Sequence, residues 1–170
     1  MMRTVTAIEV RRAKPDDAEA LVRLRGLMLE SMGMGMGMGE AIGGADAPWR
    51  DVAVRYFTEG LASPQTFAAF VVDDPAAGVV AGAAGHCNLH APSPKDLSTT
   101  RGTVYNVSTE PAFRRRGLAR ACVVALLDWF RDETDAGQLE LHATQSGDAL
   151  YRALGFVAST YPAQRLVIVR

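Results

Sequence analysis

Cysteine is scarce in this sequence, and long apolar runs are absent from it. Of the 170 residues only Cys87 and Cys122 are cysteines, too few for a disulfide framework and without the spacing of a metal site. The longest strongly apolar run covers residues 121–127, whereas a membrane-spanning helix needs about 20 residues. Residues 1–5 lead into a β-like segment without the apolar core of a signal peptide. We therefore expect reduced cysteines, a cytoplasmic location and no membrane partner.

An excess of either charge is also lacking. The chain has 18 basic and 19 acidic residues, which gives a net charge of −1. Proteins that bind nucleic acids through phosphates usually carry a basic excess, so no nucleic-acid partner is expected. Hydrophobic residues make up 48% and charged residues 22%, a composition that excludes intrinsic disorder of the whole chain. The length and the even composition predict a single domain over residues 1–170.

The only pattern that approaches a metal site joins His86, Cys87 and His90. These residues fall at the end of a predicted strand, where side chains four positions apart share a face but lie about 13 Å from each other. That distance is too long for one ion, so we expect no bound metal.

Hydrophobic periodicity predicts an α/β fold with elements in the order β-α-α-β-β-β-α-β-α-β. This order indicates a mixed central sheet with an antiparallel front half. The strands are predicted over residues 6–12, 66–73, 78–88, 102–109, 138–143 and 165–169, and the helices over 15–30, 51–61, 117–132 and 147–154. Residues 32–39 read MGMGMGMG, and so many glycines make a poor strand. We expect a flexible low-complexity loop over residues 32–48.

The segment that carries chemistry is the passage from the strand at 102–109 to the helix at 117–132. Three arginines, at 114–116, precede Gly117, and a small residue follows at Ala119. The first N–H groups of a helix have no partner within it and carry the positive end of its dipole. Such a terminus binds phosphate where a glycine lets the ligand approach closely. The pattern predicts a site for the pyrophosphate of a cofactor; the alternative is a solvated basic turn before an ordinary core helix.

A second motif, Leu150-Tyr151-x-x-Leu154-Gly155-Phe156, follows this turn. Together with Arg114-x-x-Gly117-x-Ala119, and in this order, it resembles the GNAT superfamily of acyl-CoA-dependent N-acetyltransferases. The predicted element order fits that fold over nearly the whole chain. The resemblance implies a GNAT-like mixed sheet with a strand-turn-helix site for acetyl-CoA, which would be the acyl donor.

The resemblance also assigns roles to particular residues. The strand near Val107 would separate from its neighbour at 138–143, and its backbone would pair with the pantetheine arm of CoA. The N–H of Val107 would polarise the thioester carbonyl, and Tyr151 would protonate the departing thiolate; the alternative for Tyr151 is a tyrosine that only anchors its helix. The residues expected to bind acetyl-CoA are Val107, Ser108, Thr109, Arg114, Arg115, Arg116, Gly117, Leu118 and Ala119.

Two positions depart from the general family pattern. Thr144 and Gly147 stand where many members have Asn and Ala, which puts a side-chain contact to pantetheine in question. The strand at 103–109 also lacks a carboxylate that could serve as general base. Glu110 is expected to be solvated. His142 is a candidate base because histidine titrates near neutral pH, although a structural histidine or a chain of waters remains an alternative.

The expected function is transfer of an acetyl group from acetyl-CoA to the primary amine of a small molecule or peptide. The amine would attack directly, through a tetrahedral intermediate, in a pocket formed by residues 28–56 and 90–101. A non-catalytic acyl-CoA-binding or regulatory module of the same fold is the alternative. A homodimer remains open.

Overall fold

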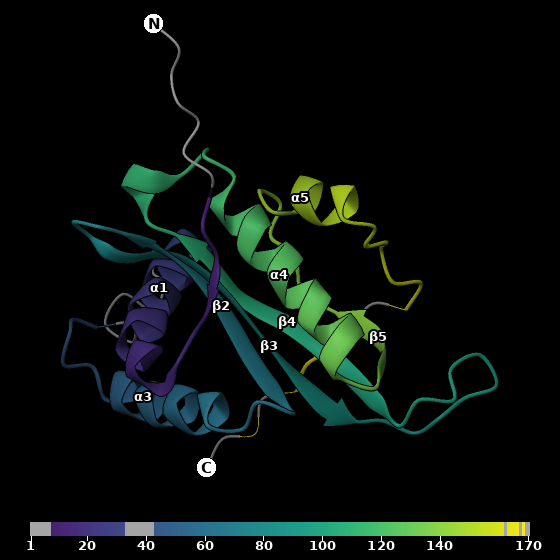
Figure 1. The fold of residues 1–170 in the computed structure, drawn as a ribbon. Coiled ribbons are helices and arrows are strands. Elements are labelled where there is room, and N and C mark those ends of the chain that lie inside the picture. The colour runs from purple at the N-terminus through teal and green to yellow at the C-terminus, as the bar shows by residue number, and fades with distance from the viewer. Residues whose placement is uncertain (1–7, 33–42, 162, 167, 169–170) are drawn as a thin grey trace, which may run out of the picture.

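The computed structural model describes residues 8–32, 43–161, 163–166 and 168, and its centre is a twisted sheet (Figure 1). The strands follow each other across the sheet in sequence order. Neighbours from the first to the fourth strand are antiparallel, and the fifth is parallel to the fourth. The strands are β1 (Arg11–Arg12), β2 (Phe67–Asp74), β3 (Gly78–Leu89), β4 (Thr100–Thr109) and β5 (Ala136–Glu140).

Helices cover both faces of the sheet. Figure 1 shows α1 (Ala18–Ser31) and α3 (Pro48–Leu61) on one face and α4 (Leu118–Glu133) on the other, with the short α5 (Asp148–Ala153) beside α4. Each covered face has its own hydrophobic core. The core under α4 includes Val104, Leu118, Cys122, Val123, Leu126, Trp129 and Phe130, and the core under α1 and α3 includes Leu21, Leu24, Phe57, Phe67 and Val71.

Small residues in the sheet let α4 approach it closely. A Cβ atom built on Gly85 of β3 would lie 2.7 Å from the Phe130 ring, and one on Gly102 of β4 would lie 2.5 Å from it. Both distances are shorter than real side chains allow. The glycines therefore make room for Phe130 of the helix, which is almost completely buried.

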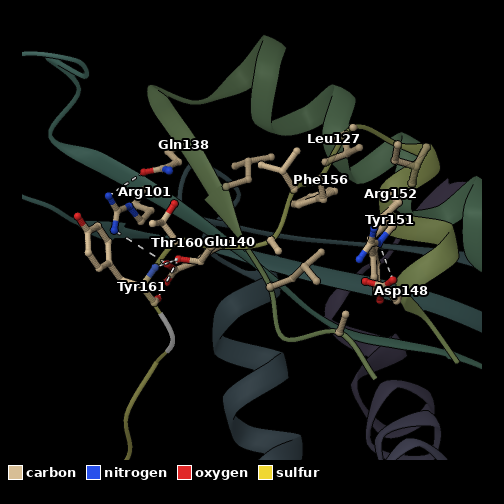
Figure 2. Close-up of a pocket in the computed structure, with 18 residues that line it drawn as sticks. Arg101, Leu127, Gln138, Glu140, Asp148, Tyr151, Arg152, Phe156, Thr160 and Tyr161 are labelled. Carbon is tan, nitrogen blue, oxygen red and sulfur yellow. Dashed lines mark hydrogen bonds and ion pairs between the residues drawn. The ribbon is translucent and has the colours of Figure 1, made fainter. Parts of the chain in front are cut away.

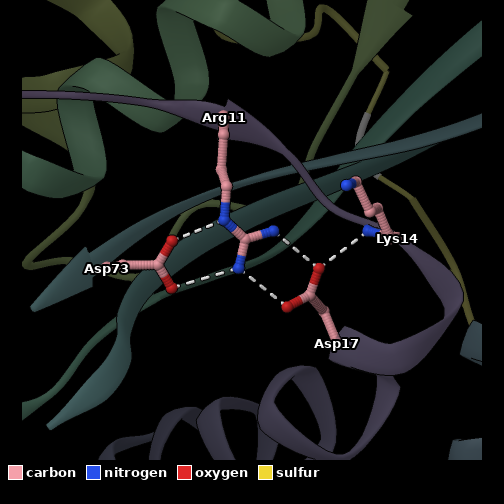
Figure 3. A network of polar contacts seen from close by, with 4 residues as sticks. All are labelled: Arg11, Lys14, Asp17 and Asp73. Carbon is pink, nitrogen blue, oxygen red and sulfur yellow. Dashed lines mark hydrogen bonds and ion pairs between the residues drawn. The ribbon is translucent and has the colours of Figure 1, made fainter. Parts of the chain in front are cut away.

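An arginine-centred network fastens the first strand to the sheet (Figure 3). The Arg11 guanidinium donates two hydrogen bonds of 2.8 Å to Asp17, in the 3₁₀ turn Pro15–Asp17, and pairs with Asp73 of β2. Asp17 also accepts the backbone N–H of Lys14 at 2.7 Å. The hydrogen bonds from Arg11 hold the pKa of Asp17 below its ordinary value.

The predicted α/β class and most of its elements are confirmed, with shifted ends. The helix expected at 51–61 begins three residues earlier, at Pro48, a favoured first helical residue. The strand expected at 138–143 starts and ends earlier, at Ala136 and Glu140. Of the opening strand, residues 6 and 7 lie outside the described part. So do residues 33–42 of the expected loop at 32–48; residues 43–47 form a turn.

The closing strand predicted at 165–169 is not found in the described residues. Residues 165, 166 and 168 belong to no strand, and Leu166 is 86% exposed. The alternating pattern of this segment satisfies the local requirement for a strand, but a strand also needs a hydrogen-bonding neighbour. The prediction of this element is therefore wrong for the described part of the chain.

Candidate active site

A β-bulge in β4 shapes the centre of the candidate site. Ser108 is opposite Gly82 and Tyr105 is opposite Ala84, so two residues of β4, Asn106 and Val107, face one residue of β3. Asn106 has a φ of +53°, a left-handed conformation that asparagine tolerates better than most residues. Its buried side chain donates a 3.2 Å hydrogen bond to the carbonyl of Leu21 in α1.

The bulge breaks the alternation of side chains along β4. Tyr105 packs with the core under α1 and α3, and the next residue, Asn106, contacts α1 as well. Val107 then packs against the core under α4. In a regular strand, consecutive side chains lie on opposite faces of the sheet. The extra residue therefore places the side chains from Val107 onward on the face opposite to the one that regular alternation would give them.

Beyond the middle of β4, the strand loses its neighbour on one side. Its pairing with β5 runs from Thr100 opposite Ala136 to Thr103 opposite Glu140 and goes no further. After Glu140 the chain leaves the sheet and turns toward α5 (Figure 1). Val107, Ser108 and Thr109 therefore lie along an edge of β4 that pairs with no described strand. The Thr109 hydroxyl is buried there without a hydrogen-bond partner.

The turn between β4 and α4 has the geometry of an anion site. Arg115 and Gly117 both have left-handed backbones, with φ of +63° and +79°. Turns with such residues direct successive N–H groups into a concavity that accepts anions. The N–H of Ala121 is the first that bonds back to Gly117, at 3.0 Å, so the N–H groups of the preceding helical residues point out of the helix end.

Side chains around this turn leave its backbone open. A Cβ atom built on Gly117 would have only Ile8 Cδ1 within 4 Å, at 3.8 Å. Arg114 donates to the carbonyl of Thr109 at 3.1 Å, and Arg116 stacks on the Phe113 ring at 4.9 Å. These contacts hold the arginines at the rim, and exposed Arg115 completes the basic turn. Residues 114–119 thus fit a pyrophosphate group.

Tyr151 lies on α5 and packs against the core under α4, as Val107 does. Its ring meets Phe156 edge-on, with centroids 6.0 Å apart. Burial raises the pKa of the Tyr151 hydroxyl, because the charged phenolate would lose solvation. At neutral pH the hydroxyl therefore keeps its proton and can donate it.

A groove of about 1100 Å³ passes Tyr151 and follows β5. In Figure 2, Asp148, Tyr151 and Arg152 lie at one end of it and Arg101, Gln138 and Tyr161 at the other. Neither Val107 nor the turn at 114–119 belongs to its lining. The groove therefore includes Tyr151 but neither the Val107 strand edge nor the turn at residues 114–119.

The two candidates for the general base have different surroundings. Glu110 was expected to be solvated, but its carboxylate forms an ion pair with Arg23 of α1. His142 lies in the segment between β5 and α5, where its side chain is exposed. Within the described residues, neither of them makes a hydrogen bond or ion pair with Tyr151 or Val107, so neither is positioned as an evident base.

A second cavity, of about 350 Å³, lies between α1, α3 and β4. Its walls include Trp49, Val52, Tyr56, Phe57, Tyr105 and Arg25. The hydroxyls of Tyr56 and Tyr105 are 2.5 Å apart, and burial together with this hydrogen bond raises the pKa of Tyr105. We call this cavity the aromatic pocket.

The sequence analysis expected an acceptor pocket formed by residues 28–56 and 90–101. Four residues of the described lining fall in the first range and none in the second, whereas Arg25, Phe57 and Tyr105 lie outside both. Tyr105 had no local signal, because its hydrogen-bond partner lies 49 residues away.

Comparison with known proteins identifies the class to which this fold and site belong. The model of the Acetyltransferase (GNAT) family matches residues 38–156. The chain therefore belongs to the GNAT acetyltransferase family. A search of curated proteins gave no match. Among the described residues, no helix is long and apolar enough to cross a membrane.

Solved structures share the fold at low sequence identity. A GCN5-related N-acetyltransferase from Ralstonia eutropha is 23% identical, with a TM-score of 0.73 over 94% of this chain and 99% of that one. A predicted acetyltransferase from Clostridium acetobutylicum, solved with acetyl-CoA, is 20% identical, with a TM-score of 0.77 over 94% and 96%. Glucosamine-6-phosphate N-acetyltransferase from Arabidopsis thaliana is 13% identical, with a TM-score of 0.64 over 95% and 99%.

Proposed function

We propose that this protein, as one domain over residues 1–170, transfers an acetyl group from acetyl-CoA to a primary amine. The observation that carries the proposal is the edge of β4 that lies open beyond Thr103 and leads to the left-handed turn at the start of α4. An extended pantetheine arm pairs with a free strand edge, and a pyrophosphate fits the N–H groups of the turn. The free thiols of Cys87 and Cys122 accord with a reducing compartment such as the cytoplasm.

In this proposal, different residues bind different parts of the acetyl-CoA molecule. The N–H groups at 115–119 and the Arg114 side chain bind the pyrophosphate. The backbone of residues 107–109 aligns the pantetheine arm. The N–H of Val107, beside the bulge, stabilises the oxyanion that forms when the amine nitrogen attacks the thioester carbon. A donor aimed at such an oxyanion contributes roughly 3–4 kcal/mol to the lowering of the barrier.

The intermediate then collapses with cleavage of the carbon–sulfur bond. The departing thiolate takes the proton of the Tyr151 hydroxyl, whose raised pKa keeps it protonated until then. The nitrogen loses one proton to water, and Tyr151 regains its own from solvent. The products are the N-acetylated acceptor and CoA as free thiol.

The acceptor is expected to deprotonate without a dedicated carboxylate. Among the residues that the structure describes, the lining of the aromatic pocket contains no Asp or Glu, and Glu110 is held by Arg23. The reaction rate should therefore follow the fraction of acceptor that is neutral, assisted by water or weakly by His142.

Release of free thiol from acetyl-CoA in the presence of a panel of primary amines tests the proposal. Acetyl transfer predicts thiol release that depends on the amine and gives an equal amount of acetylated product. A non-catalytic acyl-CoA-binding module predicts calorimetric binding of acetyl-CoA with no amine-dependent release. The absence of both binding and release would reject both functions.

A further inference from the structure

The aromatic pocket is a preformed apolar surface. Phe57 is 1% exposed, and Tyr56 packs edge-on against it with centroids 5.3 Å apart. The Arg50 guanidinium covers the Trp49 ring at 4.8 Å. Contacts among the protein's own side chains thus hold the walls of the aromatic pocket in place. A volume of about 350 Å³ is at the small end of ligand sites and suits one ring or one large aliphatic group.

One charge faces this apolar surface. Among the described residues of the lining, Arg25 is the only ionised side chain, and it lies close enough to Tyr105 to act electrostatically on its hydroxyl. Within the part of the chain that the structure describes, Arg25 has no carboxylate partner. Two other arginines nearby do have partners: Arg23 is paired with Glu110, and Arg50 donates to the carbonyl of Gly44 at 2.9 Å.

A half-buried guanidinium without a counter-charge favours an anionic ligand. The same charge repels a lone alkylammonium ion. A simple hydrophobic amine would therefore leave Arg25 unpaired, whereas an amine that also carries a carboxylate would satisfy it.

The position of Arg25 sets the distance between that carboxylate and the reacting amine. Leu21, one helical turn before Arg25, accepts the hydrogen bond from Asn106 of the bulge. Four residues rise about 6 Å along a helix, so the guanidinium lies near the part of β4 that leads to the Val107 N–H. This closeness requires amine and carboxylate to be near each other in the acceptor.

We propose that the acceptor is a free α-amino acid with an aromatic or large aliphatic side chain. This inference rests on the acetyl transfer proposed above. Arg25 binds the carboxylate, the side chain fills the aromatic pocket, and the α-amino group faces the thioester. The carboxylate and the side chain together orient the amine for attack.

The test compares two acceptors that differ in the carboxylate, with kcat/KM expressed per neutral amine, because an amide in place of the carboxylate lowers the pKa of the α-amine. L-Phenylalanine and L-phenylalaninamide share the amine and the ring, but only the first carries a carboxylate. We expect kcat/KM for acetylation of phenylalanine to exceed that of the amide at least about tenfold. Arg25→Gln should abolish this preference, mainly through KM, and Arg25→Lys should retain part of it. Arg55→Gln, an exposed arginine on α3, is the matched control and should keep the preference.

A binding measurement separates this inference from the proposed function. Phenylalanine is titrated calorimetrically into the wild-type protein and, separately, into each variant, with the protein saturated with CoA. Thermal unfolding checks that each variant is folded. Binding that Arg25→Gln weakens at least tenfold supports the inference. The inference is wrong if phenylalanine and its amide bind or turn over equally, or if Arg25→Gln keeps the preference for phenylalanine. Either result would leave the proposed acetyl transfer unaffected. Failure to bind CoA at all rejects the proposed function, and the inference with it.

Discussion

Tyr151 is half-buried, and burial raises the pKa of its hydroxyl, which favours the neutral form that still carries the proton for a departing thiolate. The aromatic ring also has a structural contact, with Phe156. A phenylalanine in its place preserves the ring and removes only the proton donor. Single-residue substitution therefore separates the chemical role of Tyr151 from its packing role.

Tyr151→Phe should lower kcat by roughly 10–1000-fold, the usual contribution of an acid or base group, with little change in acetyl-CoA affinity. Kinetics of thiol release and calorimetry with acetyl-CoA measure the two quantities. Tyr161→Phe, at an exposed tyrosine of the neighbouring groove, is the control and should keep wild-type turnover. Wild-type turnover of Tyr151→Phe would remove this residue from the mechanism.

His142→Gln should retain most of the activity, because the exposed side chain of His142 has no partner that orients it among the described residues. In wild type and variant alike, kcat/KM should rise from about pH 6 to pH 9 as the neutral fraction of the acceptor grows. The pH–rate profile of both proteins is the measurement. A loss of about 100-fold in a folded variant, with an altered profile, would identify His142 as the base.

At the scale of elements, the turn that begins α4 combines a left-handed glycine with unpaired helical N–H groups. A side chain at position 117 would meet open space, so it would occupy the volume proposed for the pyrophosphate. The helix itself is held by its buried face and does not depend on the ligand.

Gly117→Glu should abolish binding of acetyl-CoA while the protein stays folded. The matched control is Gly78→Glu at the first residue of β3, which has a similar φ of +71° and no atom within 4 Å of a built Cβ. Each substitution places a non-glycine residue in the left-handed region, at a cost of about 1–2 kcal/mol. Calorimetry should show lost affinity in the first variant only. Equal affinity in both would refute the pyrophosphate assignment.

The sequence predicts elements best where one local pattern is sufficient. The spacing of Leu118, Cys122, Leu126 and Phe130 defines α4 to within one residue at either end. The bulge of β4 was missed, although asparagine inside a strand is a signal for a left-handed residue. The early end of β5 and the aromatic pocket depend on contacts between distant segments, and periodicity contains no information on them.

At the scale of the whole molecule, the Arg11 network joins the start of the chain to the second strand. Asp17 accepts hydrogen bonds from both Arg11 and the Lys14 backbone, and its side chain is 13% exposed. Its lowered pKa means that the folded state prefers the ionised carboxylate more strongly than the unfolded state does. This stabilisation is complete above the ordinary pKa of aspartate and is lost as pH falls through the lower pKa of the folded state.

Asp17→Asn should reduce the free energy of unfolding at pH 7 by about 1–3 kcal/mol, as expected for hydrogen bonds to a charged group. Urea denaturation at a series of pH values should show the difference from wild type shrinking below about pH 4, where the unfolded carboxylate becomes protonated, until the pH falls below the lower pKa of the folded carboxylate. Asp16→Asn, at the exposed neighbouring position, is the control and should change stability little. A deficit that is constant with pH would contradict the linkage to Asp17 ionisation.

The extra residue in β4 also determines how the strand would respond to a change in length. Deleting Asn106 would restore a regular ladder with β3, since two residues of β4 now face one of β3. Tyr105 would keep its place beside Tyr56, but the backbone that now bulges beside the open edge would lie flat. A single-codon deletion would thus remove both the Asn106 hydrogen bond to Leu21 of α1 and the bulge that distinguishes the Val107 amide from an ordinary strand amide. A side-chain substitution in β4 leaves this backbone offset in place, whereas a change in the number of its residues would remove it.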